Sequence, residues 1–378
     1  MTATHTPTHT PAQTPTTGAA DAVRAADRNP FVGRVEQYAE QVLRPTALRT
    51  DREGVTAERV DELRRLGLLN HLAPVEHGGQ AGLDRAAERR LHEIVAGACL
   101  NTWLVWAQHA PVSAPHDADG TRRAAPGELG RRALRGEVLL GAAISDVRRF
   151  PDRYVAAGRT ATGWTFSGVV SWVSGWGLNA ALTVAAVEPG TETVVTALVA
   201  VGERTRATPL QLSVVPGSRT VRVELDDVPV PADQVISTRS LADWRVADLA
   251  VAADARPHHF GVADTVLAEL AREEHPLAAE VVATWTPRVA QLRADAYGLA
   301  DEAGAAGGGG HRLAERLATK VAVGAALSAL TQALVVARSG HGIAGDDTAQ
   351  LHARSALFLL VQGQNADVRR AQLAHLAR

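Results

Sequence analysis

The chain has 378 residues, of which 46% are hydrophobic and 21% charged, as in an ordinary soluble protein with two or three subdomains. Its formal net charge is -2 and its pI is about 6.7. This balance excludes the basic surface that nucleic acid or an anionic membrane would require, so neither is expected as a partner.

The single cysteine, Cys99, excludes a disulfide within the chain and a thiolate metal site. It stands in an apolar stretch, which predicts a buried structural thiol. No metal-ligand spacing is present among the histidines either, so no metal is predicted. One cysteine suits a reducing cytoplasm, which is the location we expect.

Residues 1–28 are predicted to be a disordered tail, because Met1 to about Ala20 consists mostly of Thr, Pro, His and Ala without periodicity. This segment has no basic stretch followed by an apolar core, so it does not resemble a signal peptide.

Residues 29–137 predict an N-terminal helical domain. Apolar residues recur at helical spacing over Val35–Leu43, and Pro45 is expected to limit that helix. A second helix is predicted over Thr56–Leu69 with Thr56 as its N-cap, and a third over Asp84–Ala98.

Residues 138–238 predict a middle β domain. Short apolar or alternating runs separated by turn residues imply an antiparallel sheet or barrel. The predicted strands are Tyr154–Arg159, Trp164–Gly168, Ala181–Val187, Thr193–Val201 and Val221–Leu225.

Residues 239–378 predict a C-terminal helical bundle, interrupted by a glycine-rich loop at Glu302–Gly310. The most apolar stretch, Val321–Ala337, contains polar residues and is short for a membrane span, so a helix buried against other helices is the better interpretation.

Four motifs resemble those of the acyl-CoA dehydrogenase family. They are Leu63–Leu69 followed by Pro74–Gly79, Leu225–Ala232, Ala271–Glu274 and Ser339–Gly342. The resemblance covers nearly all of the chain after the tail. It implies an α+β fold, mostly α, with an N-terminal helical domain, a middle antiparallel β domain and a C-terminal four-helix bundle. It also implies a homodimer or homotetramer built around Val321–Ala337.

The resemblance implies FAD between the β domain and the bundle, with its adenine end reaching a second subunit. Trp172 would cover the flavin ring and Ser174 would hydrogen-bond its N5 edge. Ser145 lies in the second flavin-holding segment, and Gly340 and Gly342 form the glycine motif of the last helices. A tryptophan buried on a strand is the alternative interpretation of Trp172.

Two departures weaken the expectation of FAD. The segment Ala142–Phe150 lacks the family's glycine-rich stretch and carries Arg148 and Arg149, which would bind an anion or face solvent. Glu274 stands where the resemblance implies an arginine that meets the FAD pyrophosphate, and a carboxylate repels a diphosphate. FMN, or no flavin at all, is therefore the alternative to FAD.

Gln362 stands where the resemblance implies the carboxylate that removes the substrate's α-proton. A carboxamide cannot accept that proton. Some relatives place the base on an earlier helix, and counting back from Ala271 that position falls on Asp248, with Asp254 as second choice. A solvated carboxylate on a helix face is the alternative interpretation of Asp248.

Three functions remain open. The first is a flavin-dependent oxidoreductase that acts on an acyl thioester or related small molecule. The second is a flavin monooxygenase of the same fold, supplied with reduced flavin by a partner reductase. The third is a flavin-free or non-catalytic subunit, working with a homologous subunit, in which His258, His259 and His341 would serve acid–base chemistry.

Overall fold

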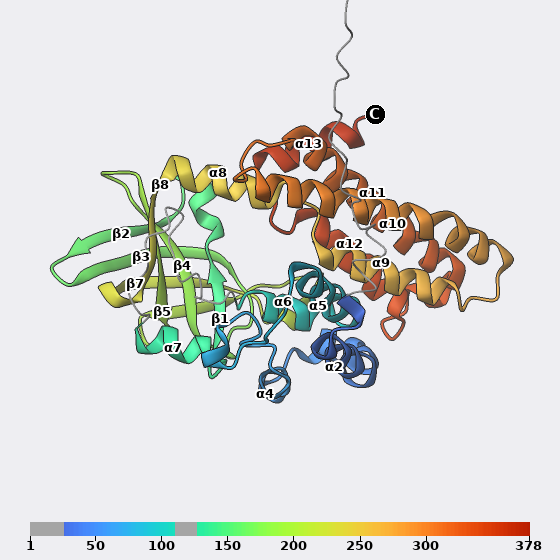
Figure 1. Ribbon diagram of the computed structural model, residues 1–378, viewed down its shortest axis with the longest axis horizontal. Helices are drawn as coiled ribbons and strands as arrows, with labels where there is room; N and C mark the ends of the chain where they lie inside the picture. Colours follow the sequence, from blue (N-terminus) through green and yellow to red (C-terminus); the bar gives the residue numbers. More distant parts are fainter. Residues whose placement is uncertain (1–25, 110–126) are drawn as a thin grey trace, which may run out of the picture.

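The computed structural model describes residues 26–109 and 127–378, so most of the predicted tail lies outside the described residues. Figure 1 shows a β sheet on one side of the molecule and a group of long helices on the other, with the N-terminal helices packed between them on the lower side. Helix α8 (Leu241–Ala252) connects the sheet to the bundle along the upper edge. The predicted α+β fold, mostly α, is confirmed.

Pro45 does not end the first helical region, contrary to the expectation from the sequence. The chain stays helical through α2 (Pro30–Tyr38), a π-helical segment (Ala39–Leu43), a 3-10 turn (Arg44–Thr46) and α3 (Ala47–Glu53). A proline has no N–H to donate, and a local change of helix type accommodates it without stopping the helix.

Side-chain oxygens cap three N-terminal helices, as polar residues at an N-cap are expected to do. Asn29 caps α2, Thr56 caps α4 (Ala57–Leu66) and Asp84 caps α5 (Arg85–Ala98). The predicted Thr56 cap is therefore confirmed. Two shorter helices follow, α6 (Leu100–Ala107) and α7 (Glu128–Leu134).

Within the described residues, eight strands form one sheet in the order β6-β7-β3-β2-β4-β5-β8, with β1 beside β4. They are β1 (Leu139–Ala143), β2 (Val155–Thr160), β3 (Gly163–Val173), β4 (Asn179–Glu188), β5 (Thr193–Ala200), β6 (Thr205–Pro209), β7 (Val221–Pro231) and β8 (Val235–Ser240). The sheet is antiparallel as predicted, except that β1 runs parallel to β4 and β2 meets β4 in parallel at one pair.

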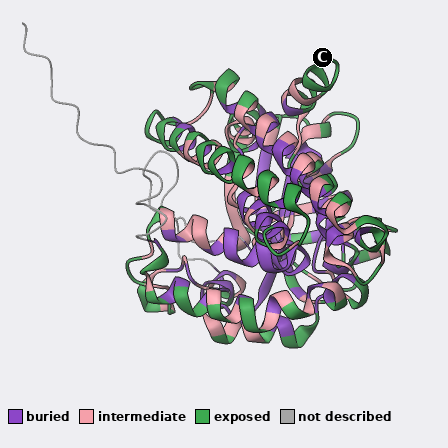
Figure 2. Ribbon diagram, turned by 90° about the vertical axis from the view of Figure 1, so that its right-hand side faces the viewer, coloured by how far each residue is buried: buried purple, intermediate pink, exposed green. Residues whose placement is uncertain are grey.

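The C-terminal bundle consists of α9 (Pro257–Leu270), α10 (Pro276–Ala305), α11 (Leu313–Arg338) and α12 (Thr348–Val361), which pack against one another. Helix α13 (Ala366–Leu376) follows and packs on α11. The interruption between α10 and α11 covers residues 306–312 rather than the predicted 302–310, because α10 continues to Ala305 and α11 begins only at Leu313. Figure 2 shows the buried residues gathered where these helices meet, with exposed residues on their outer faces.

Two glycines let α5 of the first domain cross α9 of the bundle at close range. A Cβ on Gly97 would lie 2.5 Å from the Gly261 carbonyl oxygen, and a Cβ on Gly261 would lie 2.0 Å from the Glu93 carbonyl oxygen. Neither position has room for a side chain, so the N-terminal domain and the bundle share one core at this crossing.

The segment Leu313–Ile343, which contains α11, is long and apolar enough to cross a membrane by length and composition alone. Half of its most apolar window is buried against the protein. A core helix meets the same criterion, so this is weak support for a membrane span. Across residues 26–109 and 127–378, no group of three or more His, Cys, Asp or Glu side chains gathers in a way that would hold a metal ion.

Candidate active site between the sheet and the helical bundle

Arg148 joins three segments that lie far apart in the sequence. From the 3-10 helix η4 (Ser145–Arg149), its guanidinium donates to both carboxylate oxygens of Asp248 on α8, over 2.8 Å from Nε and 2.7 Å from Nη2. Its Nη1 donates to the backbone oxygen of Gln364, 3.3 Å away, in the turn after α12. The segments of Ser145, Asp248 and Gln362 are thereby brought to one junction.

Asp146 fixes the end of β3 against η4. Its buried carboxylate accepts hydrogen bonds of 2.7 Å from the backbone N–H and 2.7 Å from the hydroxyl of Ser171. The next residue, Trp172, is 46% exposed, and no other tryptophan among the described residues is in the exposed class. Ile144, directly before η4, is also exposed. Trp172 and Ile144 are thus exposed apolar side chains beside the contact between Asp146 and Ser171, and the face of an indole suits a flat aromatic ligand.

The hydroxyl of Ser174 points into the sheet domain. It lies 2.8 Å from the Thr220 hydroxyl, which in turn lies 2.7 Å from the Ser218 hydroxyl. The Asn179 side-chain amide donates to the Ser174 carbonyl oxygen at 2.8 Å. The hydrogen bond predicted from Ser174 to a flavin stays a prediction; if the Ser174 hydroxyl accepts from Thr220, its own O–H remains available to donate.

None of the three residues considered for the position of the base presents a carboxylate free of partners. Gln362 ends α12 as its C-cap and is a half-buried carboxamide. Asp248 has both oxygens bound to Arg148, and must release part of that pair before it can accept a proton. Asp254, the second choice, accepts a 2.6 Å hydrogen bond from Nε of Arg316 and faces α11.

Gly340 and Gly342 lie away from this junction. They belong to the 3-10 segment Ser339–Ile343 between α11 and α12, whereas Gln362 follows the other end of α12. A helix of 14 residues spans about 21 Å, so one small ring cannot contact both ends. Gly340 is exposed with open space around it, and Gly342 is buried against the Val335 carbonyl oxygen.

Three basic side chains cap the C-terminal end of α8, a feature that the sequence reasoning missed. Arg316, Arg256 and Lys320 donate to the carbonyl oxygens of Ala250, Val251 and Ala252, in that order. These carbonyls lack helical partners and carry partial negative charge, so cations stabilise the end of the helix that bears Asp248. Lys320 is the only lysine among the 39 lysine and arginine residues of the chain, which is the compositional signal that would have singled it out.

His258 and His259 lie in a buried aromatic column rather than at a surface. The ring centroid of His258 lies 4.1 Å from that of Trp103 and 4.4 Å from that of His259. Nε1 of Trp103 donates a 3.0 Å hydrogen bond to Nδ1 of His92. Burial lowers the pKa of His92 and His259 to about 3 and that of His258 well below its usual value, so these histidines are neutral at physiological pH. The acid–base role predicted for His258 and His259 stays a prediction, as does that of the exposed His341.

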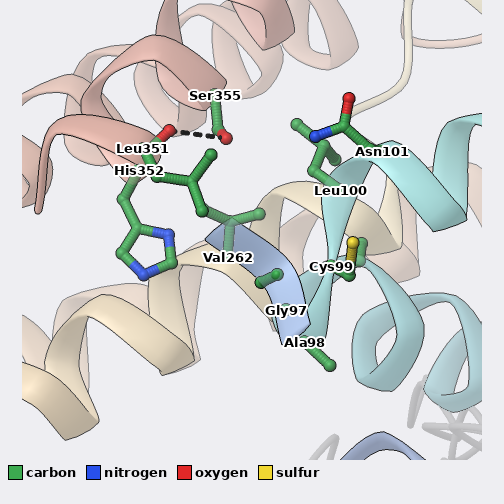
Figure 3. A pocket seen from close by; sticks show the side chains of 11 residues that line it. Gly97, Ala98, Cys99, Leu100, Asn101, Val262, Leu351, His352 and Ser355 are labelled. Atoms are coloured by element: carbon green, nitrogen blue, oxygen red, sulfur yellow. Dashed lines mark hydrogen bonds between the residues drawn. The ribbon is translucent and has the colours of Figure 1, made fainter. Parts of the chain in front are cut away.

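A small cavity of about 10 Å³ lies where α5, α6, α9 and α12 meet, and Figure 3 shows the side chains around it. Cys99, Val262 and Ser355 line it, and the Ser355 hydroxyl donates to the Leu351 carbonyl oxygen at 2.8 Å. A space of this size holds at most a water molecule. Cys99 is buried, as predicted, and burial raises the pKa of its thiol.

Comparisons with known proteins agree with this architecture. The family model of the acyl-CoA dehydrogenase N-terminal domain matches residues 26–124. A search of curated proteins found no match.

Several solved structures share the fold. Butyryl-CoA dehydrogenase from Megasphaera elsdenii has a TM-score of 0.75 and 16% identity, covering 95% of this chain and 98% of that chain. Glutaryl-CoA dehydrogenase from Mycobacterium smegmatis, in complex with FADH2, has a TM-score of 0.73 and 16% identity, covering 93% of this chain and 94% of that chain. A chain from a structure of the electron transferring flavoprotein of Acidaminococcus fermentans has a TM-score of 0.75 and 14% identity, covering 93% of this chain and 98% of that chain.

The chain therefore has the acyl-CoA dehydrogenase fold over nearly its whole length. The fold agrees with the match of residues 26–124 to that family's N-terminal domain and with the resemblance of the sequence motifs. At these identities the solved structures establish the fold and leave the substrate to be argued from the site.

Proposed function

We propose that this protein is a flavin-dependent oxidoreductase that acts on an acyl thioester or a related small molecule. The reaction would take place where η4, the end of β3, α8 and the turn after α12 meet. The observation that carries the proposal is the exposed indole of Trp172, the residue directly after Ser171, which Asp146 of η4 holds by two hydrogen bonds.

The residues of this chain fit the ring end of a flavin better than its phosphate end. Trp172 would cover the isoalloxazine ring, and Ser145 and Ser174 would supply hydrogen bonds to its edge. The exposed Gly340, with Gly342 behind it, would face the adenine end of a flavin held by a second subunit. Exposed Glu274 offers a phosphate no positive charge. FAD is the proposed cofactor, and FMN is the alternative because it lacks the adenylate.

The bound flavin would accept a hydride from the substrate, and the chain would have to remove a proton. Asp248 is the carboxylate that we assign to this task, with Arg148 as the residue that orients it. Gln362, in the neighbouring turn, would donate a hydrogen bond to a substrate carbonyl rather than accept a proton.

A flavin monooxygenase is the second candidate, because Gln362 carries no charge and Asp248 is held by Arg148. Oxygen transfer from a reduced flavin needs no base for an α-proton. This function would require a reductase partner. A flavin-free subunit that works with a homologous chain is the third candidate.

We also propose that the protein is a homodimer or homotetramer. Large apolar side chains remain exposed on α11, α12 and α13 of the single chain, namely Val336, Leu357, Val361, Leu373 and Leu376. Exposed apolar side chains on one group of helices favour burial against another subunit.

The absorption spectrum of the purified protein is the first test. We expect flavin bands, and FAD or FMN in the supernatant after denaturation. Anaerobic mixing with butyryl-CoA then separates the candidates: bleaching of the flavin supports the dehydrogenase, while an unbleached flavin that reacts with oxygen after chemical reduction supports the monooxygenase. A colourless protein that takes up neither FAD nor FMN would contradict both redox functions.

A further inference from the structure

Lys320 and Arg256 are positive side chains at the junction of α8, α9 and α11 that have no carboxylate within ion-pair distance among the described residues. Lys320 is only 6% exposed, and Arg256 is half-buried. The Lys320 ammonium donates to the Ala252 carbonyl oxygen at 2.7 Å, and the Arg256 guanidinium to that of Val251 at 2.9 Å. A carbonyl oxygen satisfies a donor but does not neutralise a charge.

The nearby carboxylates already face other cations. Asp254 lies within electrostatic range of Arg256 and Lys320 but is ion-paired with Arg316, and Asp248 is ion-paired with Arg148. Glu88 of α5 lies within electrostatic range of Arg256, but it stands between Arg85 and Arg89, and burial raises its pKa. Lys320 and Arg256 are therefore an excess of positive charge in a poorly hydrated place.

The charged state of both groups is disfavoured in the absence of an anion. Burial lowers the pKa of Lys320 to about 8, and the positive charges of Arg256 and Arg148 act in the same direction. Burial also lowers the pKa of Arg256; Asp254 opposes this effect, and the neighbouring arginines add to it. Uncompensated buried charge destabilises a fold, so its presence calls for a counter-ion.

Two further features at the start of α9 favour an anion here. Arg256 and Pro257 begin α9, a helix of 14 residues whose first N–H groups favour negative charge. In its first turn, His258 is 4% exposed, and its Nε2 has no hydrogen-bond partner within the described part of the chain. A buried ring nitrogen without a partner is costly unless a ligand or water completes it.

The location connects this charge to the candidate active site. Lys320 lies within electrostatic range of Arg148, whose guanidinium binds Asp248 and the turn that follows Gln362. An anion at Lys320 and Arg256 would therefore lie close to the residues assigned to the reaction.

We propose that Lys320 and Arg256 bind an anionic group of the ligand, a carboxylate or a phosphate, so that the substrate carries negative charge at the end of its acyl group. The acyl part of this inference rests on the proposed function. The anion site itself rests only on the charges and hydrogen bonds around α8 and α9.

The single lysine makes a direct test possible, because protein labelled with carbon-13 lysine gives one set of lysine side-chain signals by NMR. Titration of its Cε signal with pH reports the protonation of Lys320 in the whole protein. The probes are glutaryl-CoA and 5-methylhexanoyl-CoA, in which an isopropyl group of the same shape replaces the carboxylate. Free glutarate and inorganic phosphate separate the two sources of the anion.

We expect glutaryl-CoA to raise the pKa of Lys320 by about one unit and to bind about tenfold more tightly than 5-methylhexanoyl-CoA. Arg256→Met and Lys320→Met should each remove this preference. Arg288→Met, which removes an exposed cation from α10 of the same bundle, should keep it. Since Arg256→Met leaves Lys320 in place, its lysine signal also shows whether the site remains folded.

Equal affinity for the two thioesters, with a Lys320 signal that none of the four probes moves, would overturn the proposal. If glutarate or phosphate raises the pKa of Lys320 while neither thioester binds, the anion site is supported and the acyl thioester function fails. If glutaryl-CoA binds through this site without bleaching a bound flavin, the inference is supported and dehydrogenation is contradicted.

Discussion

Arg148 and Asp248 form a two-point ion pair that ties the sheet domain to the first helix of the C-terminal region. The pair is partly buried, with side chains 23% and 13% exposed, and its hydrogen bonds are 2.8 and 2.7 Å long. The same guanidinium also reaches the turn after α12. The residue expected to bind an anion and the residue expected to act as a base are thus partners of each other.

The variants Arg148→Met and Asp248→Asn should each lower the apparent melting temperature by several degrees, because each leaves a partly buried polar group without its partner, at a cost of about 1–3 kcal/mol. The melting temperature of the double variant should fall by less than the sum of the two single falls, since the two side chains interact directly. Differential scanning fluorimetry measures this cycle. If the two single effects simply add in the double variant, the interaction between Arg148 and Asp248 contributes nothing to stability.

Gln362→Glu should raise the rate at which butyryl-CoA bleaches the flavin by about tenfold or more, because a positioned base contributes about 10²–10⁴ in rate. Stopped-flow absorbance under anaerobic conditions measures the rate. Gln364→Glu is the matched control, since it adds the same charge in the same turn while its side chain faces Arg369 and Gln372. Equal rates in the two variants would show that residue 362 takes no part in the reaction.

Trp172→Ala should weaken flavin binding by about tenfold, because an aromatic stacking contact contributes about 0.5–1.5 kcal/mol. Trp172→Phe should retain most of the affinity, since it keeps an aromatic face. Quenching of flavin fluorescence during titration measures the dissociation constant. Trp285→Ala, on α10, is the control, and the same loss in both alanine variants would contradict a flavin contact at Trp172.

The sequence predicted five strands of the sheet because each is apolar or alternates between turns, but it missed β1, β6 and β8. The strand β1 reads Leu-Leu-Gly-Ala-Ala and is almost entirely buried, so it has no alternation to detect. The strands β6 and β8 are the outer strands of the sheet, and their polar residues resemble a loop.

The candidate site shows a similar limit. The family motifs singled out Trp172, Asp248 and Gln362, but no motif predicts that Arg148 binds Asp248. That pairing depends on how two domains pack, and residues 100 positions apart leave no periodic signal. Lys320 was missed for the opposite reason, because its position in an apolar helix resembles ordinary core and only its rarity in the composition marks it.

Gly261→Ala should destabilise the protein, because the new methyl group would lie 2.0 Å from the Glu93 carbonyl oxygen and would push α5 and α9 apart. Overpacking of this kind costs about 1–3 kcal/mol or more. Gly298→Ala, inside α10 with open space around it, should instead stabilise by about 0.5–1 kcal/mol through helix propensity. Melting temperatures that move in the same direction for both variants would contradict the close crossing.

Glu269 should make stability depend on acid pH. Burial alone would raise its pKa, but hydrogen bonds and charge from His352, Thr348 and Arg338 outweigh this and lower the pKa from 4.5 to about 2. A carboxyl group with a lowered pKa stabilises the fold above pH 4.5, and this contribution, about 3 kcal/mol at most, disappears as the pH falls toward 2.

Glu269→Gln should therefore melt several degrees below the natural protein at pH 7, and the gap between the two melting temperatures should shrink steadily between pH 5 and pH 3. The exposed Glu280→Gln should show little difference at either pH. A gap that stays constant from pH 7 to pH 3 would mean that the loss comes from packing rather than from the charge of Glu269.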